Sequence, residues 1–287
     1  MISFPNCKIN LGLTVISKRT DGYHDLETVF YPVPVNDVLE IISCSIHDLH
    51  TQQEKMDLVI FSISGLAISG SFNDNLCVKA YRLLKKDFPD LPPVKMHLHK
   101  VIPMGAGLGG GSADGAFTLR LLNEKYQLNL TNTQLINYAV MLGSDCPFFI
   151  INKPCFAGSR GEMMEVISLD LSDYTTVLVN CGIHINTGWA FSQLGRTTDQ
   201  QEEARPLKNI IQGPVAGWKD ILGNDFEQPV FRSYPALKDI KDALYSQGAV
   251  YAAMSGSGST VFGLFAKDKQ FVNDFPVDYE VIVVKSP

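Results

Sequence analysis

The chain of 287 residues has no apolar run of the roughly 18–20 residues that a membrane span needs. Its first residues contain no basic segment followed by an apolar one, so we expect no secretory signal and a cytoplasmic location. Basic residues are fewer than acidic ones, 24 against 30, and this balance gives no electrostatic sign of nucleic-acid binding. We therefore expect a globular protein with neither a membrane nor a nucleic acid as partner, either a monomer or a weak homodimer.

Cysteine is also scarce, and its spacing excludes the usual metal centres. The six cysteines are scattered, with no C-x-x-C pair and no accompanying histidine at ligand spacing. Such residues are typical of reduced, buried, small hydrophobic side chains. We expect no protein-bound structural metal.

The sequence favours an α+β fold. Alternating apolar and polar residues predict strands, and helical spacing predicts helices, without strict β-α-β order. A new set of predicted strands begins after residue 157. The polar run 196–205 is typical of a solvated loop. The predicted strands are 7–15, 28–31, 38–44, 58–63, 94–102, 176–180, two within 250–265, and 279–284; the predicted helices are 75–85, 112–123, 131–142 and 238–245.

One stretch, IPMGAGLGGGSA at 102–113, has five glycines in the seven positions 105–111. It stands between a predicted strand and a predicted helix with Ser112 as its N-cap. A flexible loop is one interpretation of such a stretch. A phosphate-binding loop is the favoured one, because amides at a helix N-terminus attract anions and glycine lets them approach closely.

The common phosphate-loop templates do not fit this stretch. Gly105, Gly107 and Gly110 satisfy G-x-G-x-x-G, but Glu124 lies in a helical context where a dinucleotide fold needs an acidic residue after a strand. A P-loop needs a lysine before the serine, and Gly111 runs directly into Ser112. The sequence also lacks the H-R-D and D-F-G motifs of protein kinases.

Three segments, in order, resemble the motifs of the GHMP kinases, the family of galactokinase, homoserine kinase and the mevalonate kinases. The resemblance implies an N-terminal nucleotide-binding domain of the ribosomal protein S5 domain 2-like type over 1–156. It also implies a ferredoxin-like C-terminal domain over 157–287 and an active site in the cleft between the two. The segments are Lys8-Ile9-Asn10-Leu11, the glycine stretch from Pro103 to Ala113, and Met254-Ser255-Gly256-Ser257-Gly258-Ser259-Thr260-Val261-Phe262.

Within that family, three further segments resemble the members that act on a cytidine diphosphate derivative of methylerythritol. The resemblance implies ATP-dependent phosphorylation of that substrate's C2 hydroxyl, in the non-mevalonate route to isoprenoid precursors. The segments are Asp21-Gly22-Tyr23-His24-Asp25-Leu26, Leu142-Gly143-Ser144-Asp145-Cys146-Pro147-Phe148-Phe149 and Asn224-Asp225-Phe226-Glu227.

The resemblance also implies a role for individual residues. Asp145 would orient the acceptor hydroxyl and accept its proton, and Lys8 would stabilise the developing charge. The alternative interpretation of Asp145 is a helix-capping residue before Cys146 and Pro147, a role that it could combine with catalysis. The alternative for Lys8 is a position on a solvent-exposed strand face. Mg²⁺ would bridge the phosphate oxygens, with Ser112 as a candidate ligand. ATP would be bound by Pro103, Met104, Gly105, Ala106, Gly107, Leu108, Gly109, Gly110, Gly111, Ser112 and Ala113, and its adenosine by Asn75 and Lys100.

The acceptor site follows from the resemblance as well. Tyr23 and Phe191 would sandwich the pyrimidine, and His24 would read its polar edge. Two residues, Gly188 and Arg160, depart from the family's usual pattern around this pocket. The remaining acceptor contacts would come from Asn10, Thr187, Gly256 and Ser257.

Other functions stay open on the sequence alone. One alternative is a sibling kinase that acts on a sugar, homoserine or mevalonate. A second is a nucleotide-binding regulator without catalysis, although Lys8 and Asp145 are both present. A third is a nicotinamide oxidoreductase.

Overall fold

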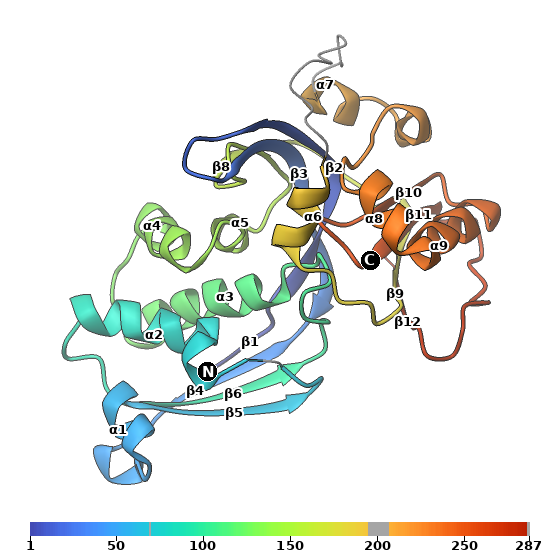
Figure 1. Cartoon of the computed structure of the whole chain (residues 1–287). Helices are drawn as coiled ribbons and strands as arrows, with labels where there is room; N and C mark the ends of the chain where they lie inside the picture. The colour runs from blue at the N-terminus through green and yellow to red at the C-terminus, as the bar shows by residue number, and fades with distance from the viewer. Residues whose placement is uncertain (69, 195–206, 286–287) are drawn as a thin grey trace. The chain divides into compact units, whose positions relative to one another are not determined.

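A computed structural model describes residues 1–68, 70–194 and 207–285 (Figure 1). The predicted solvated loop at 196–205 lies outside the described residues. In chain order, the elements are β1 (Ile2–Ser3), β2 (Asn6–Lys18), β3 (His24–Asn36), β4 (Val38–Ser43), η1 (Ile46–Asp48), α1 (Gln52–Asp57), β5 (Val59–Gly65), η2 (Phe72–Asp74), α2 (Leu76–Asp87), β6 (Val94–Lys100), α3 (Gly110–Lys125), α4 (Asn132–Leu142), α5 (Cys146–Ile151), β7 (Cys155–Gly158), β8 (Met163–Val166), β9 (Tyr174–Asn180), α6 (Thr187–Gln193), α7 (Leu207–Ile211), η3 (Val215–Asp220), α8 (Glu227–Ser233), α9 (Pro235–Ser246), β10 (Tyr251–Met254), β11 (Val261–Ala266) and β12 (Glu280–Lys285).

The chain forms two compact units. The first contains residues 1–7, 34–104 and 109–152, and the second contains 8–33, 105–108 and the residues from Lys153 onward. The expected domain boundary at 156/157 stays a prediction. The two compact units differ from that division in one respect. Most of the β2–β3 hairpin and the middle of the glycine-rich loop belong to the same unit as the C-terminal part of the chain.

The first unit is a sheet covered by helices. Its strand order is β1-β4-β6-β5, with β4 antiparallel and β5 parallel to β6. Helices α2 and α3 lie along one face of this sheet (Figure 1). Alternate residues of β6 are buried, so its last inward-facing residue is Lys100. This strand ends where the glycine-rich loop begins.

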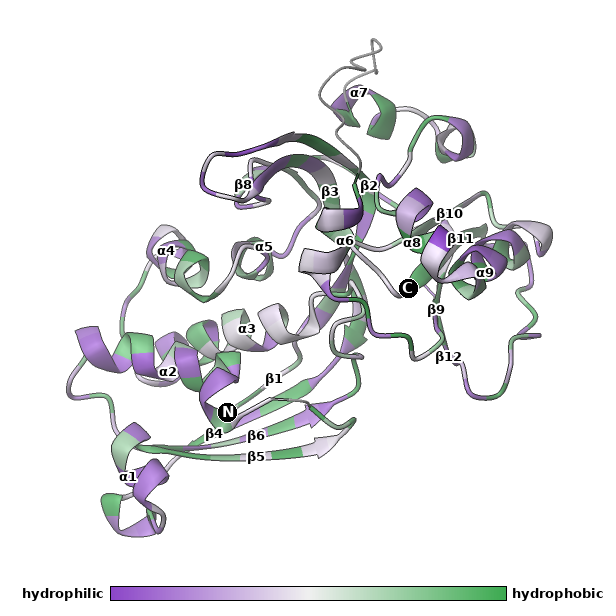
Figure 2. Ribbon diagram, viewed as in Figure 1, coloured by the Kyte–Doolittle hydropathy of each residue, from purple (hydrophilic) through white to green (hydrophobic). Residues whose placement is uncertain are grey.

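The second unit contains two four-stranded sheets, ordered β2-β3-β7-β8 and β10-β11-β9-β12. The second of these sheets is antiparallel throughout. Helix α9 buries Leu237, Ile240 and Leu244 against it, at the spacing of one helical face. Figure 2 shows both hydrophilic and hydrophobic residues along α9, as expected for a helix with one buried side.

The structure places a strand or a helix at each predicted range, although several ends differ. Strand β3 spans 24–36 where 28–31 is predicted, and α9 begins at Pro235, three residues before the predicted start. Helix α3 begins at Gly110 with Gly109 as its N-cap, so the prediction of Ser112 as N-cap is wrong. Three consecutive glycines allow the helix to begin before the serine. Gly143 is the C-cap residue of α4, and its φ of 167° is extended backbone.

Candidate active site

The glycine-rich stretch is a loop between β6 and α3. Gly105, Gly107 and Gly109 have φ values of 66°, 79° and 71°, a left-handed region that favours glycine. The first N–H groups of a helix have no partner within it, and they carry the positive end of its dipole. The loop therefore leads directly into the amides of a 16-residue helix, which is the geometry that phosphate binding needs. That residues 103–113 contact ATP stays a prediction.

The middle of the loop lies against the turn between β10 and β11. A Cβ atom at position 107 would be 1.9 Å from the carbonyl oxygen of Ser255. Ser255 Oγ donates to the carbonyl oxygen of Gly107 at 2.8 Å, and the Thr260 N–H donates to that of Ala106 at 3.1 Å. The third sequence motif thus supports the second within one unit.

Lys8 and Asn10 are buried, and this decides between the two interpretations of their strand face. Each is only 3% exposed, so the solvent-exposed interpretation is wrong. Lys8 Nζ donates to the carbonyl oxygen of Gly107 at 2.9 Å and to Asn10 Oδ1, and it lies 5.2 Å from the centre of the Phe30 ring. The ammonium group is therefore held beside the loop.

Asn10 is oriented by contacts on both sides. Its side-chain amide donates to Thr28 Oγ1 at 2.9 Å, and its backbone N–H donates to Ser255 Oγ at 3.2 Å. Thr28 Oγ1 in turn donates to the carbonyl oxygen of Gly12 at 2.6 Å. The predicted substrate contact of Asn10 is untested, but the structure shows that its side chain already orients Lys8.

Asn224 is a positioning residue that the sequence interpretation did not assign. Its side-chain amide donates at 2.8 Å to the carbonyl oxygens of Met254 and Gly256, which fixes the turn beneath Gly107. Glu227 Oε1 accepts the Met254 N–H at 2.8 Å. Both residues belong to the Asn224-Asp225-Phe226-Glu227 segment, which the sequence analysis singled out by resemblance. The spacing of residues in a sequence cannot show which backbone groups their side chains bind.

Two other predicted acceptor contacts lie close together. Thr187 Oγ1 and Ser257 Oγ are 3.1 Å apart. A Cβ atom at Gly256 would be 3.3 Å from Asn10 Oδ1. The second unit therefore brings Asn10, Thr187, Gly256 and Ser257 to the turn that supports the loop.

The sandwich of the pyrimidine between Tyr23 and Phe191 stays a prediction, and the structure shows how the rings around it lie. His24, not Tyr23, stacks on Phe191, with ring centres 4.5 Å apart and planes 15° from parallel. Burial lowers the pKa of His24, so this ring is neutral at pH 7. Tyr23 is 56% exposed, and the Arg160 guanidinium lies 4.9 Å from the centre of its ring. Arg160, noted above as a departure from the family pattern, thus contacts a predicted substrate residue.

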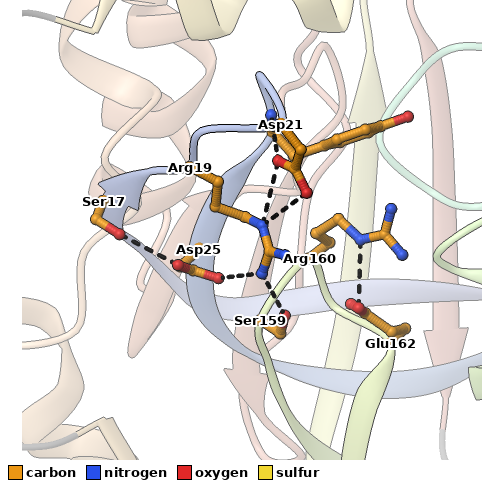
Figure 3. Close-up of polar contacts among 8 residues, drawn as sticks. Ser17, Arg19, Asp21, Asp25, Ser159, Arg160 and Glu162 are labelled. Carbon is orange, nitrogen blue, oxygen red and sulfur yellow. Dashed lines mark hydrogen bonds and ion pairs between the residues drawn. The ribbon is translucent and has the colours of Figure 1, made fainter.

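Polar contacts hold the hairpin turn that carries Tyr23 and His24 (Figure 3). Arg19 lies between two carboxylates, with Nε 3.1 Å from Asp21 and Nη1 3.0 Å from Asp25. Asp21 Oδ1 accepts the backbone N–H of Tyr23 at 3.1 Å, and this bond lowers the pKa of Asp21. Ion pairs and a hydrogen bond among residues of the hairpin therefore hold the conformation of the turn. Because these groups are exposed, the ion pairs contribute little stability.

The first unit contains the remaining predicted residues. Asn75 is the N-cap of α2, and its Oδ1 accepts the Cys77 N–H at 2.9 Å. Asp145 occupies the N-cap position of α5, but its side chain makes no capping hydrogen bond, which weakens the purely capping interpretation. Lys100 is fully buried, and its ammonium group binds Asp37 and Asp114. A side chain so enclosed does not reach a nucleotide, which argues against the predicted adenosine contact by the Lys100 side chain.

Asp114, the third member of this cluster, has a raised pKa. Burial raises its pKa to about 8, against an opposing effect of the Lys100 ammonium group. The unfolded chain releases this proton near pH 4, whereas the folded chain keeps it up to about pH 8. Between these values the folded state binds more protons, so the free energy of unfolding falls as pH rises.

We expect Asp114→Asn to melt at a higher temperature than the parent protein, because asparagine cannot ionise. The difference should be largest at pH 8 and should shrink as pH falls toward 4. Thermal unfolding at pH 5, 6.5 and 8 measures it. Asp87→Asn, the same change at a carboxylate that binds the Tyr138 hydroxyl, is the control. An equal difference at every pH contradicts the expectation.

No cluster of three or more His, Cys, Asp or Glu suited to a metal ion occurs in the described part of the chain. Ser112, the candidate Mg²⁺ ligand, lies in the first turn of α3 and makes a hydrogen bond with the Cys146 thiol.

Among residues 1–68, 70–194 and 207–285, no helix has the length and apolar character to cross a bilayer.

Comparisons with known proteins agree with these features. Residues 75–153 match the GHMP kinases N terminal domain, and residues 207–274 match the GHMP kinases C terminal family. A protein of Bacteroides fragilis named 4-diphosphocytidyl-2-C-methyl-D-erythritol kinase is 50% identical over 98% of this chain and 96% of its own length. The protein of that name from Cytophaga hutchinsonii is 48% identical over 92% of both chains.

Solved structures show the same relationship. A crystal structure of 4-(cytidine 5'-diphospho)-2C-methyl-D-erythritol kinase matches with a TM-score of 0.74 and 30% identity, covering 92% of this chain and 90% of that one. Mevalonate kinase from Methanococcus jannaschii matches with a TM-score of 0.71 at 13% identity, over 99% of this chain and 97% of that one, which shows the shared fold. The expected two-domain fold is therefore confirmed, and the chain belongs to the GHMP kinase family, among the 4-diphosphocytidyl-2-C-methyl-D-erythritol kinases.

Proposed function

We propose that this ATP-dependent kinase transfers the γ-phosphoryl group of ATP to the C2 hydroxyl of 4-diphosphocytidyl-2-C-methyl-D-erythritol. The products are ADP and the 2-phosphate of the acceptor. The observation that carries the proposal is the 50% identity, over 98% of the chain, to a protein that bears this enzyme's name. The buried Lys8 beside the glycine-rich loop supports it, because a catalytic ammonium group is expected there.

The reaction needs positioning and charge neutralisation more than covalent chemistry. The loop amides and the first turn of α3 bind the triphosphate. The acceptor oxygen then forms a bond to the γ-phosphorus while the bond to the β-phosphate oxygen breaks. Lys8, held by the Gly107 carbonyl oxygen and Asn10, stabilises charge on the transferred group. Asp145 orients the hydroxyl and takes its proton late, because a carboxylate is a weak base toward an alcohol.

Mg²⁺ bound with the nucleotide would neutralise charge on the phosphate oxygens, and the Ser112 hydroxyl is the side chain that would hold it. Proteins that bind Mg²⁺ with ATP commonly supply only one or two oxygen ligands, the phosphates supplying others. The Ser112 hydroxyl, in the first turn of α3, fits such a role. Binding of Mg²⁺ together with ATP would therefore not require a site built from several protein ligands.

The acceptor's pyrimidine binds, in our proposal, at Tyr23, His24 and Phe191. Two of these rings are already stacked, and Phe226 supports Phe191 edge-on at 4.9 Å. A base inserted beside them gains stacking energy of about 1–3 kcal/mol. The neutral His24 ring can both donate and accept a hydrogen bond at the base edge.

We expect Phe191→Ala to raise KM for the cytidine acceptor by about tenfold or more, because the stacking surface is lost. KM for ATP should stay within about twofold of the parent value. Steady-state kinetics with each substrate varied in turn measures the two constants. Phe271→Ala removes another ring packed on the same hydrophobic core and is the matched control. If the two variants have equal acceptor KM values, Phe191 does not bind the base.

The function itself is tested by measuring ADP formation with a panel of alcohols. We expect turnover with 4-diphosphocytidyl-2-C-methyl-D-erythritol and none with mevalonate, homoserine or galactose. Turnover with one of those three, and not with the cytidine substrate, overturns the proposed acceptor. ATP binding without ADP release for any alcohol favours the regulator. An NADH absorbance change favours the oxidoreductase.

A further inference from the structure

We infer that Asp37, Lys100 and Asp114 form a buried clamp that fixes both ends of the glycine-rich loop and so positions it for ATP. All three residues belong to the first unit. Their exposed fractions are 0%, 1% and 3%. The inference rests on the part of the proposed function in which this loop binds ATP, and it assigns the three side chains to positioning, with no contact to the nucleotide.

Asp37 holds the beginning of the loop. Its Oδ1 accepts the backbone N–H groups of Val101 and Ile102, at 2.6 and 2.9 Å. Its Oδ2 accepts from the Lys100 ammonium group. Asp37 itself is rooted between β3 and β4, and its own N–H donates to the carbonyl oxygen of Pro5 at 2.9 Å. Both carboxylate oxygens are therefore engaged, and the chain is fixed where it leaves β6.

Lys100 connects that point to the far end of the loop. Its Nζ donates to Asp114 Oδ2 at 2.8 Å, and Asp114 lies in the early part of α3. The helix start approaches closely, because a Cβ atom at Gly110 would be 2.9 Å from Ile102 Cγ2 and 3.3 Å from Lys100 Nζ. One ammonium group thus joins the strand before the loop to the helix after it.

The clamp acts on ATP through geometry. The free amides of the first turn of α3 bind phosphate well only when the loop holds them in the right place before the ligand arrives. Since the cluster is buried, the ion pair between Asp37 and Lys100 is not screened by water as a surface pair is. Breaking this pair leaves an uncompensated charge next to the ends of the loop.

The two carboxylates are not equivalent, and this gives a sharp test. Asp37 uses both oxygens, so the amide of Asp37→Asn must turn its NH₂ group toward either the loop amides or Lys100, where an acceptor is needed. Asp114 uses only Oδ2, and its Oδ1 has no hydrogen-bond partner. Asp114→Asn can therefore keep its oxygen toward Lys100.

We expect Asp37→Asn to raise both the Kd and the KM for ATP by about tenfold or more. The KM for the acceptor should change by less than about twofold. Asp114→Asn should stay within about twofold for ATP. Isothermal titration calorimetry gives Kd without any acceptor, so failure of this inference and failure of the proposed acceptor are distinguishable. General destabilisation lowers the apparent kcat, and it raises the apparent Kd for ATP only by the reciprocal of the folded fraction, which stays close to one while most of the protein is folded.

Asn123→Ala is the control for stability alone. Asn123 lies near the other end of α3, where its side chain makes two hydrogen bonds with the backbone of Leu130, at 2.9 and 3.1 Å. The control should melt at a lower temperature with an unchanged Kd for ATP. An unchanged Kd in Asp37→Asn overturns the inference. An equal rise in Asp37→Asn and Asp114→Asn also overturns it, because the geometry predicts unequal effects.

Should Asp37→Asn fail to fold, Lys100→Gln carries the same test. Glutamine is shorter and has one NH₂ group for two carboxylates, so it cannot bridge them, while Asp37 keeps its bonds to the loop amides. We expect a several-fold rise in the Kd for ATP and an unchanged acceptor KM. A Kd for ATP equal to that of the parent overturns the inference.

Discussion

Replacing Asp145 with asparagine is expected to lower kcat by about 10²–10⁴-fold, the usual cost of losing a general base. The amide keeps the size of the side chain but cannot take the proton of the acceptor hydroxyl. The KM values for ATP and the acceptor should change little, since shape is kept. Coupled measurement of ADP release, with both substrates saturating, gives kcat directly.

The same variant separates catalysis from helix capping. Asparagine is as good an N-cap residue as aspartate, so a capping role predicts nearly normal turnover and stability. Asparagine also keeps the shape of the side chain at the N-cap position of α5, so the melting temperature should stay close to that of the parent. Asp87→Asn, on α2 of the same unit, is the matched control. Turnover within tenfold of the parent removes Asp145 from the proton-accepting role.

The glycine-rich loop and the elements on either side of it could be predicted from the sequence. Alternation in 94–102 and helical spacing from 112 placed the loop between a strand and a helix, and the structure confirms that order. The start of α3 could not be predicted as well. Capping preferences favour Ser112 over glycine, but α3 begins two residues earlier, at Gly110, which packs too closely on Ile102 for a Cβ atom.

Lys100 shows what spacing alone cannot give. The same alternation that buries Val94, Met96 and Leu98 places Lys100 on the inner face, so its burial was present in the pattern. A charged residue at the end of a strand is nevertheless more often a ligand contact or a solvated group. Its partners, Asp37 and Asp114, lie 63 and 14 residues away, and only tertiary structure brings them together.

Lys8 and Asn10 illustrate the opposite case. Clean alternation in 7–15 predicts one polar face, and polar faces are usually solvated. Here β3 supplies Thr28 and Phe30 to one side of that face, and the turn at Ser255 lies on the other. The family motif indicated a functional interior position where the pattern did not. The stacking of His24 on Phe191 could be derived from neither.

Gly107→Ala is expected to produce the largest effect of any single methyl group in the loop. The added carbon would lie 1.9 Å from the Ser255 carbonyl oxygen, far inside any allowed contact, so the loop must move. The φ of 79° adds a cost of about 1 kcal/mol for a residue other than glycine. Movement also carries away the carbonyl oxygen that binds Lys8 Nζ and Ser255 Oγ. ATP affinity and kcat should therefore fall together.

We expect kcat/KM for ATP to fall by about 10²-fold or more in Gly107→Ala, a loss of about 3 kcal/mol. Gly248→Ala is the matched control, because Gly248 has a φ of 98° in the same unit and no atom within 4 Å of an added Cβ. Gly248→Ala places a Cβ atom on a backbone with positive φ but causes no steric clash, so its kinetic constants should match those of the parent. Parent-like kcat/KM for ATP in Gly107→Ala would mean that close contact between the loop and the Ser255 turn is not required for catalysis. Because the collision and the strain are separated by this pair, a fall confined to Gly107→Ala assigns the effect to the contact itself.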